Sequence, residues 1–271
     1  VTRDGRANET LQTQLDFFDG PSKNSVMENK RLTPKQREIR QREVRILELA
    51  REKLAQLGYL GWNMDIIAAE LEYSKGTIYN HFSCKEEIIL ALAIETMEQR
   101  TEMFQRAVSF PGLPRERMSA IGVAAELFVR LYPHHFHVEQ LIRSHSIWEK
   151  TSEKRQTRMR WCEGRCMEMV AGVVRDGIAA GHLELNDQAL PEDLVFGLWS
   201  QTFGAYSIIA TSDSLPELGI ADPYAAVRQA IRMVLDGYQW QPLSSQHDYV
   251  ALQERIQAEV FPDECQSIAA V

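Results

Sequence analysis

A chain of 271 residues, 44% hydrophobic and 25% charged, has the composition of an ordinary globular protein. It contains no run of about 18 apolar residues, which excludes a membrane-spanning helix, and its first residues lack the apolar core of a signal peptide. We therefore expect a cytoplasmic protein whose four cysteines, which form no CxxC metal motif, stay reduced, and we expect no cofactor.

The formal net charge of −8 is distributed unevenly along the chain. Basic residues slightly outnumber acidic ones in residues 1–85, whereas acidic residues dominate the remainder. The basic residues of the first part are concentrated at Lys30, Arg31, Lys35, Arg37, Arg40, Arg42 and Arg45. Because exposed charges act mainly within a Debye length of about 8 Å, such a run is either a solvated helix face or a surface that attracts phosphates.

Residues 1–31 are polar and mixed in composition, and we expect them to form a flexible arm. Thr33-Pro34 is a favourable helix start, and the first helix should run to Leu57, where Gly58 ends it. Two short helices follow near 63–71 and 74–82, and a long fourth helix begins at Ser83-Cys84-Lys85-Glu86 and ends at Pro111-Gly112. Turn signals then separate candidate helices at Arg115–Tyr132, Pro133–Ser144, Ile147–Ala180, Pro191–Thr211, Pro223–Tyr238 and Ser245–Glu259. Since no strand-like alternation is present, the sequence predicts an all-α fold.

The two short helices carry the most informative pattern. Asn63 and Ser74 are good N-caps, because their side-chain oxygens can accept from free N–H groups of the first turn. The second helix has only a narrow apolar stripe, formed by Ile78 and Phe82. Its remaining surface carries Lys75, Thr77, Asn80 and His81. A short helix of this kind fits a recognition helix in a DNA major groove better than a core helix.

The sequence resembles the N-terminal domain of the TetR family of bacterial transcriptional regulators over about residues 42–94. The residues that carry the resemblance are Gly58-Tyr59, Asn63-Met64, Ile67-Ala68, Ser74-Lys75-Gly76-Thr77-Ile78-Tyr79-Asn80-His81-Phe82 and Lys85-Glu86-Glu87. Trp62, Glu72 and Cys84 depart from the usual pattern. Glu72 stands where the interhelical turn often has glycine, so either the turn geometry differs or Glu72 takes a right-handed conformation.

The resemblance implies a set of DNA-contacting residues. They are Asn63, Ser74, Lys75, Gly76, Thr77, Tyr79, Asn80, His81 and Lys85, with the basic residues Arg37, Arg40 and Arg42 of the first helix. Asn80 is expected to read a base, since a carboxamide pairs with adenine through two hydrogen bonds. Tyr79 and His81 are expected to bind phosphates, and Gly76 should let the backbone approach the DNA closely. Lys85, at the start of the fourth helix, is expected to bind a further phosphate together with free N–H groups.

The resemblance also implies a domain organisation. Residues 32–84 would form the three-helix, helix-turn-helix DNA-binding domain, residues 85–240 a larger helical bundle for effector binding and dimerisation, and residues 241–271 a C-terminal helical extension. One recognition helix reads only a few base pairs, so we expect a homodimer on a palindromic double-stranded DNA operator. The stripes that we assign to the dimer surface are Leu194, Val195, Leu198, Trp199, Thr202, Phe203 and Tyr206, and Val227, Ile231, Val234, Leu235 and Tyr238. Intramolecular core is the alternative for both stripes.

A small-molecule effector would bind in the middle of the bundle, and its identity is not given by the sequence. The candidate lining residues are Phe128, Tyr132, Phe136, Trp148, Trp161, Met167, Trp199, Phe203 and Tyr206, which favour an apolar or aromatic ligand. Core packing is the alternative for each of them. Two further patterns carry weaker hypotheses, and we commit to neither. In the cluster His134, His135 and His137, His134 and His137 could share a helix face and form a metal site with His145, and Cys162 and Cys166 could form a thiol sensor.

The sequence therefore predicts a sequence-specific transcriptional regulator, a repressor that an apolar or aromatic effector releases from its operator. The alternative is a DNA-binding adapter or activator whose bundle binds a protein partner and no small molecule. A cavity in the bundle favours the first, and a solid bundle with a large exposed apolar patch favours the second. No GxSxG, HExxH or phosphate-binding glycine loop is present, so we expect no enzyme.

Overall fold

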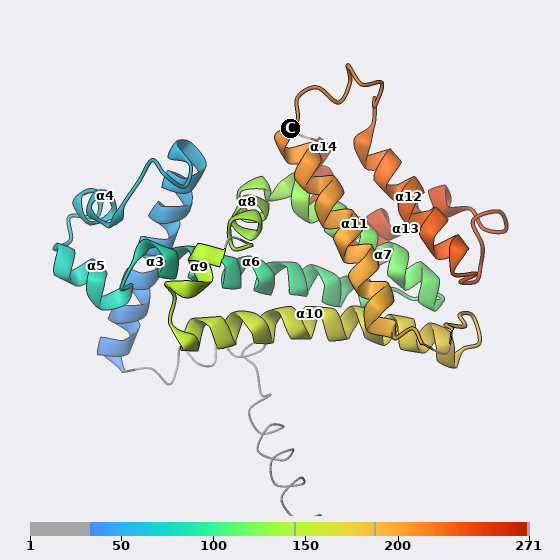
Figure 1. The fold of residues 1–271 in the computed structure, drawn as a ribbon, viewed down its shortest axis with the longest axis horizontal. Coiled ribbons are helices and arrows are strands. Elements are labelled where there is room, and N and C mark those ends of the chain that lie inside the picture. Colours follow the sequence, from blue (N-terminus) through green and yellow to red (C-terminus); the bar gives the residue numbers. More distant parts are fainter. Residues whose placement is uncertain (1–32, 144, 187, 270–271) are drawn as a thin grey trace, which may run out of the picture. The chain divides into compact units, whose positions relative to one another are not determined.

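The structure, a computed structural model, describes residues 33–143, 145–186 and 188–269, and its regular elements in these ranges are all α-helices (Figure 1). The predicted all-α fold is confirmed. The predicted arm at 1–31 lies outside the described residues. Two compact units meet within the first described helix, between Leu49 and Ala50, and the predicted domain boundary at 84–85 remains a prediction. None of the described helices combines the length and the apolar character needed to cross a membrane.

The longest connections between successive described helices are those from α10 to α11, from α11 to α12 and from α12 to α13. They are α3 (Pro34–Leu57), α4 (Met64–Glu70), α5 (Lys75–His81), α6 (Lys85–Val108), α7 (Pro114–Leu131), α8 (Pro133–Leu141), α9 (His145–Glu149), α10 (Glu153–Ala179), α11 (Pro191–Thr211), α12 (Pro223–Gly237), α13 (Tyr249–Val260) and α14 (Pro262–Ala269). In the second unit, α6 and α10 lie side by side along much of their length, and α7 packs against both (Figure 1).

Two of the predicted helices are wrong in their extent. The segment Ile147–Ala180 is divided into α9 and α10, because Ser152 has extended backbone and its N–H donates to the Glu87 carboxylate of α6. The segment Ser245–Glu259 begins late, at Tyr249, where Asp248 accepts from two N–H groups of the first turn at 3.0 Å. The last helix, α14, was not predicted and begins at Pro262.

A buried arginine fixes the C-terminal helices against α7. The Arg115 side chain is fully buried, and its guanidinium donates to Asp236 Oδ1 at 2.6 Å and to the carbonyl of Trp240. Its Cζ lies 5.0 Å from the centroid of the Tyr249 ring at the start of α13. The two hydrogen bonds join α7 to the end of α12, and the ring contact joins it to the start of α13.

Candidate nucleic-acid interface and effector cavity

The helix-turn-helix segment begins with the cap that the sequence predicts. Asn63 has extended backbone, and its Oδ1 accepts from the N–H groups of Asp65 and Ile66 at 3.0 Å each. The carboxamide oxygen is therefore occupied within the protein, which gives Asn63 a structural role in starting α4. Its predicted contact with DNA remains a prediction, with the amide NH₂ as the available group.

The turn between α4 and α5 is closed by a left-handed residue. Glu72 has a φ of +55°, so the right-handed conformation offered as one alternative is wrong. The N–H of Glu72 donates to Ala69 O at 3.2 Å, and the N–H of Tyr73 donates to Ala68 O at 2.9 Å. This pair of bonds is the Schellman arrangement, which requires positive φ at the position that Glu72 occupies. The turn between α4 and α5 thus adopts the Schellman geometry without glycine, and the backbone of Glu72 is strained as a result.

The recognition helix α5 is anchored on one side and exposed on the other. Ser74 Oγ accepts from Thr77 N at 3.1 Å and lies 2.8 Å from Thr77 Oγ1, which fixes the start of the helix. Ile78 and Phe82 are almost fully buried, as predicted for the inward pair. On the other side Tyr79 is half-exposed, and Lys75, Gly76 and Asn80 are exposed.

The remaining polar residues of the interface are partly engaged within the protein. Lys75 Nζ pairs with Asp65 Oδ2 of α4 at 2.6 Å, although both side chains are more than half-exposed. Such an exposed pair is weak and leaves the ammonium available to a phosphate. His81 is half-buried at the end of α5. In the first unit, Arg37 and Arg40 are exposed, and Arg42 Nη2 lies 2.5 Å from Glu38 Oε1.

Lys85 has partners different from the expected phosphate. Its ammonium donates to the carbonyl of Trp62 at 2.7 Å and to the carbonyl of Tyr59. It lies 4.4 Å from the ring centroid of Trp62 and 4.3 Å from that of Tyr59. Burial lowers the pKa of Lys85, although the Glu86 carboxylate raises it in part. The side chain therefore joins the start of α6 to the loop before α4. The sequence did not reveal this role, because the two carbonyls belong to a distant loop.

Two glutamates at the start of α6 connect the helix-turn-helix segment with α10. Glu86 Oε1 accepts from Tyr59 Oη at 3.1 Å and from Lys150 Nζ at 2.9 Å. Glu87 pairs with Arg155, the guanidinium of which also lies over the Phe82 ring at 4.7 Å. The start of α10 therefore contacts the residue that directly follows α5.

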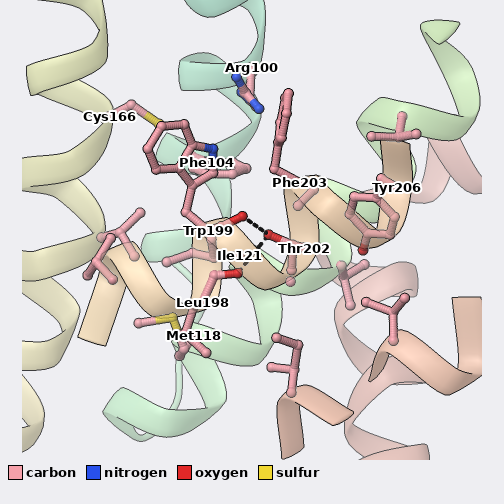
Figure 2. Close-up of a pocket in the computed structure, with 18 of the residues that line it drawn as sticks. Arg100, Phe104, Met118, Ile121, Cys166, Leu198, Trp199, Thr202, Phe203 and Tyr206 are labelled. Carbon is pink, nitrogen blue, oxygen red and sulfur yellow. Dashed lines mark hydrogen bonds between the residues drawn. The ribbon is translucent and has the colours of Figure 1, made fainter. Parts of the chain in front are cut away.

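The second unit contains a partly open cavity of about 460 Å³ among α6, α7, α8, α10, α11, α12 and α13 (Figure 2). The predicted residues that line it are Phe136, Met167, Trp199, Phe203 and Tyr206. The Phe203 ring lies 5.5 Å from that of Phe136 and 6.4 Å from that of Trp199. The sequence missed much of the lining, which includes Met97, Phe104, Met118, Ile121, Leu198 and Ile231. The sequence does not distinguish these residues from core residues, because an apolar helix face has the same pattern whether it packs against another helix or lines a cavity.

Four predicted lining residues lie elsewhere, and their assignment to the cavity is wrong. Phe128 is fully buried in the core, with the Tyr132 ring 5.5 Å away. Trp148 donates from Nε1 to Ile142 O at 2.7 Å. Trp161 is half-buried on α10, between the guanidinium groups of Arg158 and Arg165.

The cavity has charged side chains at one end. Arg100 of α6 and Arg143 both line it, as does Glu163 of α10. Arg143 Nη2 pairs with Glu163 Oε1 at 2.9 Å, and its Cζ lies 5.0 Å from the Trp199 ring centroid. Arg100 contacts Glu139 of α8, a carboxylate that is 1% exposed. An apolar cavity with a few polar groups at one end is the usual form of a small-molecule site.

The two apolar stripes assigned to the dimer surface are largely intramolecular. Leu198 and Tyr206 on α11 and Leu235 on α12 are buried and line the cavity, and α11 packs against both α10 and α12. The large apolar side chains that are exposed on the same two helices are Phe196, Ile208 and Met233, at 59%, 57% and 64%. A dimer surface on these helices would therefore use the opposite faces.

The histidine and cysteine patterns have ordinary structural roles. His135 Nδ1 lies 2.9 Å from Thr96 Oγ1, and burial lowers the pKa of His135 to about 4. Within the described residues, no group of three or more His, Cys, Asp or Glu is placed to hold a metal ion. Burial also raises the pKa of the Cys162 thiol to about 11 and raises that of Cys166, so both favour the unreactive thiol form.

A capped helix-turn-helix segment followed by a helical bundle with a cavity is an arrangement typical of helix-turn-helix transcriptional regulators. A family sequence model described as "Bacterial regulatory proteins, tetR family" matches residues 46–92. Residues 46–92, which include α4, α5 and the start of α6, are therefore similar to the DNA-binding segment of TetR-family regulators.

Individual proteins are similar to this chain over most of their length. The "Fatty acid metabolism regulator protein" of Bacillus subtilis (strain 168) is 24% identical over 183 residues, which are 65% of this chain and 92% of the relative. The solved structure of a TetR/AcrR-family regulator from Thermobifida fusca is 24% identical, with a TM-score of 0.56 over 73% of this chain and 98% of that one. A "putative fatty acid metabolism regulator" from Clostridium perfringens has a similar fold, with 20% identity and a TM-score of 0.51 over 71% of this chain and 97% of that one.

Proposed function

We propose that the protein binds a palindromic DNA operator as a homodimer, in the cytoplasm, through the exposed face of α5. The side chains that support the proposal are Lys75, Tyr79 and Asn80, which are exposed beside the buried anchor of Ile78 and Phe82. Lys75 and Tyr79 supply phosphate contacts and Asn80 supplies base readout. Two copies would associate through the exposed faces of α11 and α12, where Phe196, Ile208 and Met233 form apolar surface.

We further propose that the protein is a repressor controlled by a long-chain, fatty-acid-derived effector. The observation that carries this proposal is the cavity of about 460 Å³, which is lined by apolar side chains and is within the range of small-molecule sites. The names of the Bacillus and Clostridium relatives supply the chemical class. A cavity favours effector binding over the alternative function, an adapter with a solid bundle that binds a protein partner.

The effector would act on DNA binding through α10. Cys166 and Met167 of this helix line the cavity, and Arg155 at its start contacts Phe82 and Glu87. A ligand that shifts α10 would therefore change the support of the recognition helix. Because a ligand shifts an equilibrium only by its differential affinity for the two states, effector and operator must weaken each other's binding by the same factor.

The experiment that tests this function has two arms. Sites selected from fragmented bacterial genomic DNA should contain an inverted repeat with half-sites about one helical turn apart, or a multiple of that distance. Fatty acids and fatty alcohols of 8 to 16 carbons should bind the free protein in titration calorimetry, with affinity that rises with chain length up to the size of the cavity. Selection of no common sequence would contradict operator binding, and no binding of any chain length would contradict the effector class.

A further inference from the structure

The arginine at the end of the cavity has unused hydrogen-bonding capacity. Arg100 is 13% exposed at its side chain, and its Cζ lies 5.5 Å from the Phe128 ring centroid. Its Nη2 contacts Glu139 Oε1 and lies 3.0 Å from Met97 Sδ, a weak acceptor. Its Nε is buried and has no hydrogen-bond partner. Figure 2 shows the Arg100 guanidinium beside the Phe203 ring, at one end of the lining residues.

The counter-ion of Arg100 is incomplete as well. Glu139 is 1% exposed, and despite the short contact with Arg100 neither of its oxygens makes a hydrogen bond of good geometry. Burial raises the pKa of the Glu139 carboxyl, although Arg100 and Arg143 lower it in part. In its protonated form Glu139 gains an O–H donor and no longer neutralises Arg100. Burying such an unsatisfied pair is costly unless a further group completes it.

Two other arginines on the same cavity each donate a hydrogen bond to a carboxylate. Arg143 pairs with Glu163 at 2.9 Å, and Arg228 donates to Glu126 Oε2 at 2.6 Å. Both side chains are also more exposed than that of Arg100, at 36% and 27%. Among the arginines that line the cavity in the described chain, Arg100 is the one with a buried nitrogen that lacks an acceptor.

We infer that Arg100 binds the carboxylate of the effector, so that the effector is the free long-chain acid and not its thioester or alcohol. This inference rests on the effector class proposed above. A carboxylate accepts from Arg Nε–H and Nη–H through two parallel bonds, and a protonated Glu139 can donate to it. The apolar chain would extend from this end past Phe104, Phe203 and Met118. Neither a thioester nor an alcohol supplies the pair of anionic oxygens that this fork accommodates.

Titration calorimetry of the full chain with dodecanoic acid, 1-dodecanol and dodecanoyl thioester tests the inference. The unmodified protein should bind the acid at least about tenfold more tightly than the alcohol or the thioester. Arg100→Gln should lose this preference while still binding the alcohol within about threefold of the unmodified protein. The double variant Arg100→Gln/Glu139→Gln removes both charges, so it leaves no unpaired buried charge that could prevent folding. It should also bind acid and alcohol alike.

Arg143→Gln is the matched control, because Arg143 lies at the same end of the cavity and already pairs with Glu163. The Arg143→Gln protein should still prefer the acid to the alcohol and the thioester. Equal binding of acid and alcohol by the unmodified protein would overturn the carboxylate site and leave the apolar effector class standing. The carboxylate site would also be overturned if the preference for the acid survived in both Arg100 variants or were lost only in Arg143→Gln. A preference of the unmodified protein for the thioester would overturn it as well. No binding of any of the three compounds would instead contradict the effector class itself.

Discussion

The guanidinium of Arg155, in the first turn of α10, lies over the ring of Phe82, 4.7 Å from its centroid, while the same side chain pairs with Glu87 of α6. Phe82 is 1% exposed and directly follows the recognition helix α5. A single side chain of α10 thus contacts both the residue that follows α5 and the start of α6. It connects a helix that lines the cavity with the helix that we expect in the major groove.

Arg155→Met should uncouple the two sites. The substitution keeps most of the apolar stem and removes the charge that pairs with Glu87. Fatty-acid binding to the free protein should change by less than about twofold, whereas the ratio of operator affinities without and with fatty acid should fall toward 1. Arg160→Met is the control, since Arg160 is exposed on the same helix and donates to Gln156 and Thr157 of α10. An unchanged ratio in Arg155→Met would exclude this route.

Asn80→Ala should relax sequence preference at one position in each half-site. A bidentate amide–adenine pair contributes about 1–3 kcal/mol of discrimination, and alanine offers neither bond. Selection from a randomised operator library measures the change. Asn186→Ala, an exposed position between α10 and α11, should leave the preference as it was. If Asn80→Ala selects the same sequences as the unmodified protein, Asn80 does not read a base.

Lys85→Met should reduce stability and leave the salt dependence of DNA binding unchanged. The ammonium donates to the carbonyls of Tyr59 and Trp62, and charged hydrogen bonds of this kind contribute about 1–3 kcal/mol each. Denaturant unfolding should therefore show a loss on the order of 1–2 kcal/mol, discounted for partial exposure. Lys75→Met, at an exposed phosphate candidate, should instead reduce the salt slope by about 0.9. If Lys85→Met reduced the salt slope by the same amount, Lys85 would be a phosphate contact after all.

Glu72→Gly should stabilise the protein. Glu72 has a φ of +55°, a conformation that costs a residue with a Cβ about 1–2 kcal/mol, and glycine avoids most of this strain. Since glycine also has more conformational entropy to lose, we expect a net gain of up to about 1 kcal/mol in the free energy of unfolding. Glu72→Ala keeps the Cβ and should show no gain. A gain in both variants would mean that the Glu72 carboxylate, and not its backbone, is unfavourable.

The local features of this fold were readable from the sequence because their causes are local. Asn63 and Ser74 cap their helices with bonds that reach only two or three residues along the chain. The bounds of α11, from Pro191 to Thr211, agree with the prediction at both ends. The Ile78 and Phe82 pair was identified from its helical spacing, and both side chains are buried.

Features that depend on distant partners were not readable in the same way. The division between α9 and α10 depends on Glu87, which is 65 residues away from Ser152 in the chain. The role of Lys85 depends on carbonyls more than twenty residues earlier. Arg100 and Glu139 were not singled out at all, because a charged residue on an amphipathic helix is usually solvated, and only the packing of α6 against α8 buries this pair.

The central claim is that occupancy of the cavity and occupancy of the operator oppose each other. The most direct measurement is the dissociation constant for a selected operator, determined by fluorescence anisotropy at fixed salt with increasing dodecanoic acid. We predict a rise of at least about tenfold at saturation, equivalent to about 1.4 kcal/mol of coupling. Operator affinity that stays constant while calorimetry shows the acid bound to the protein would contradict the claim.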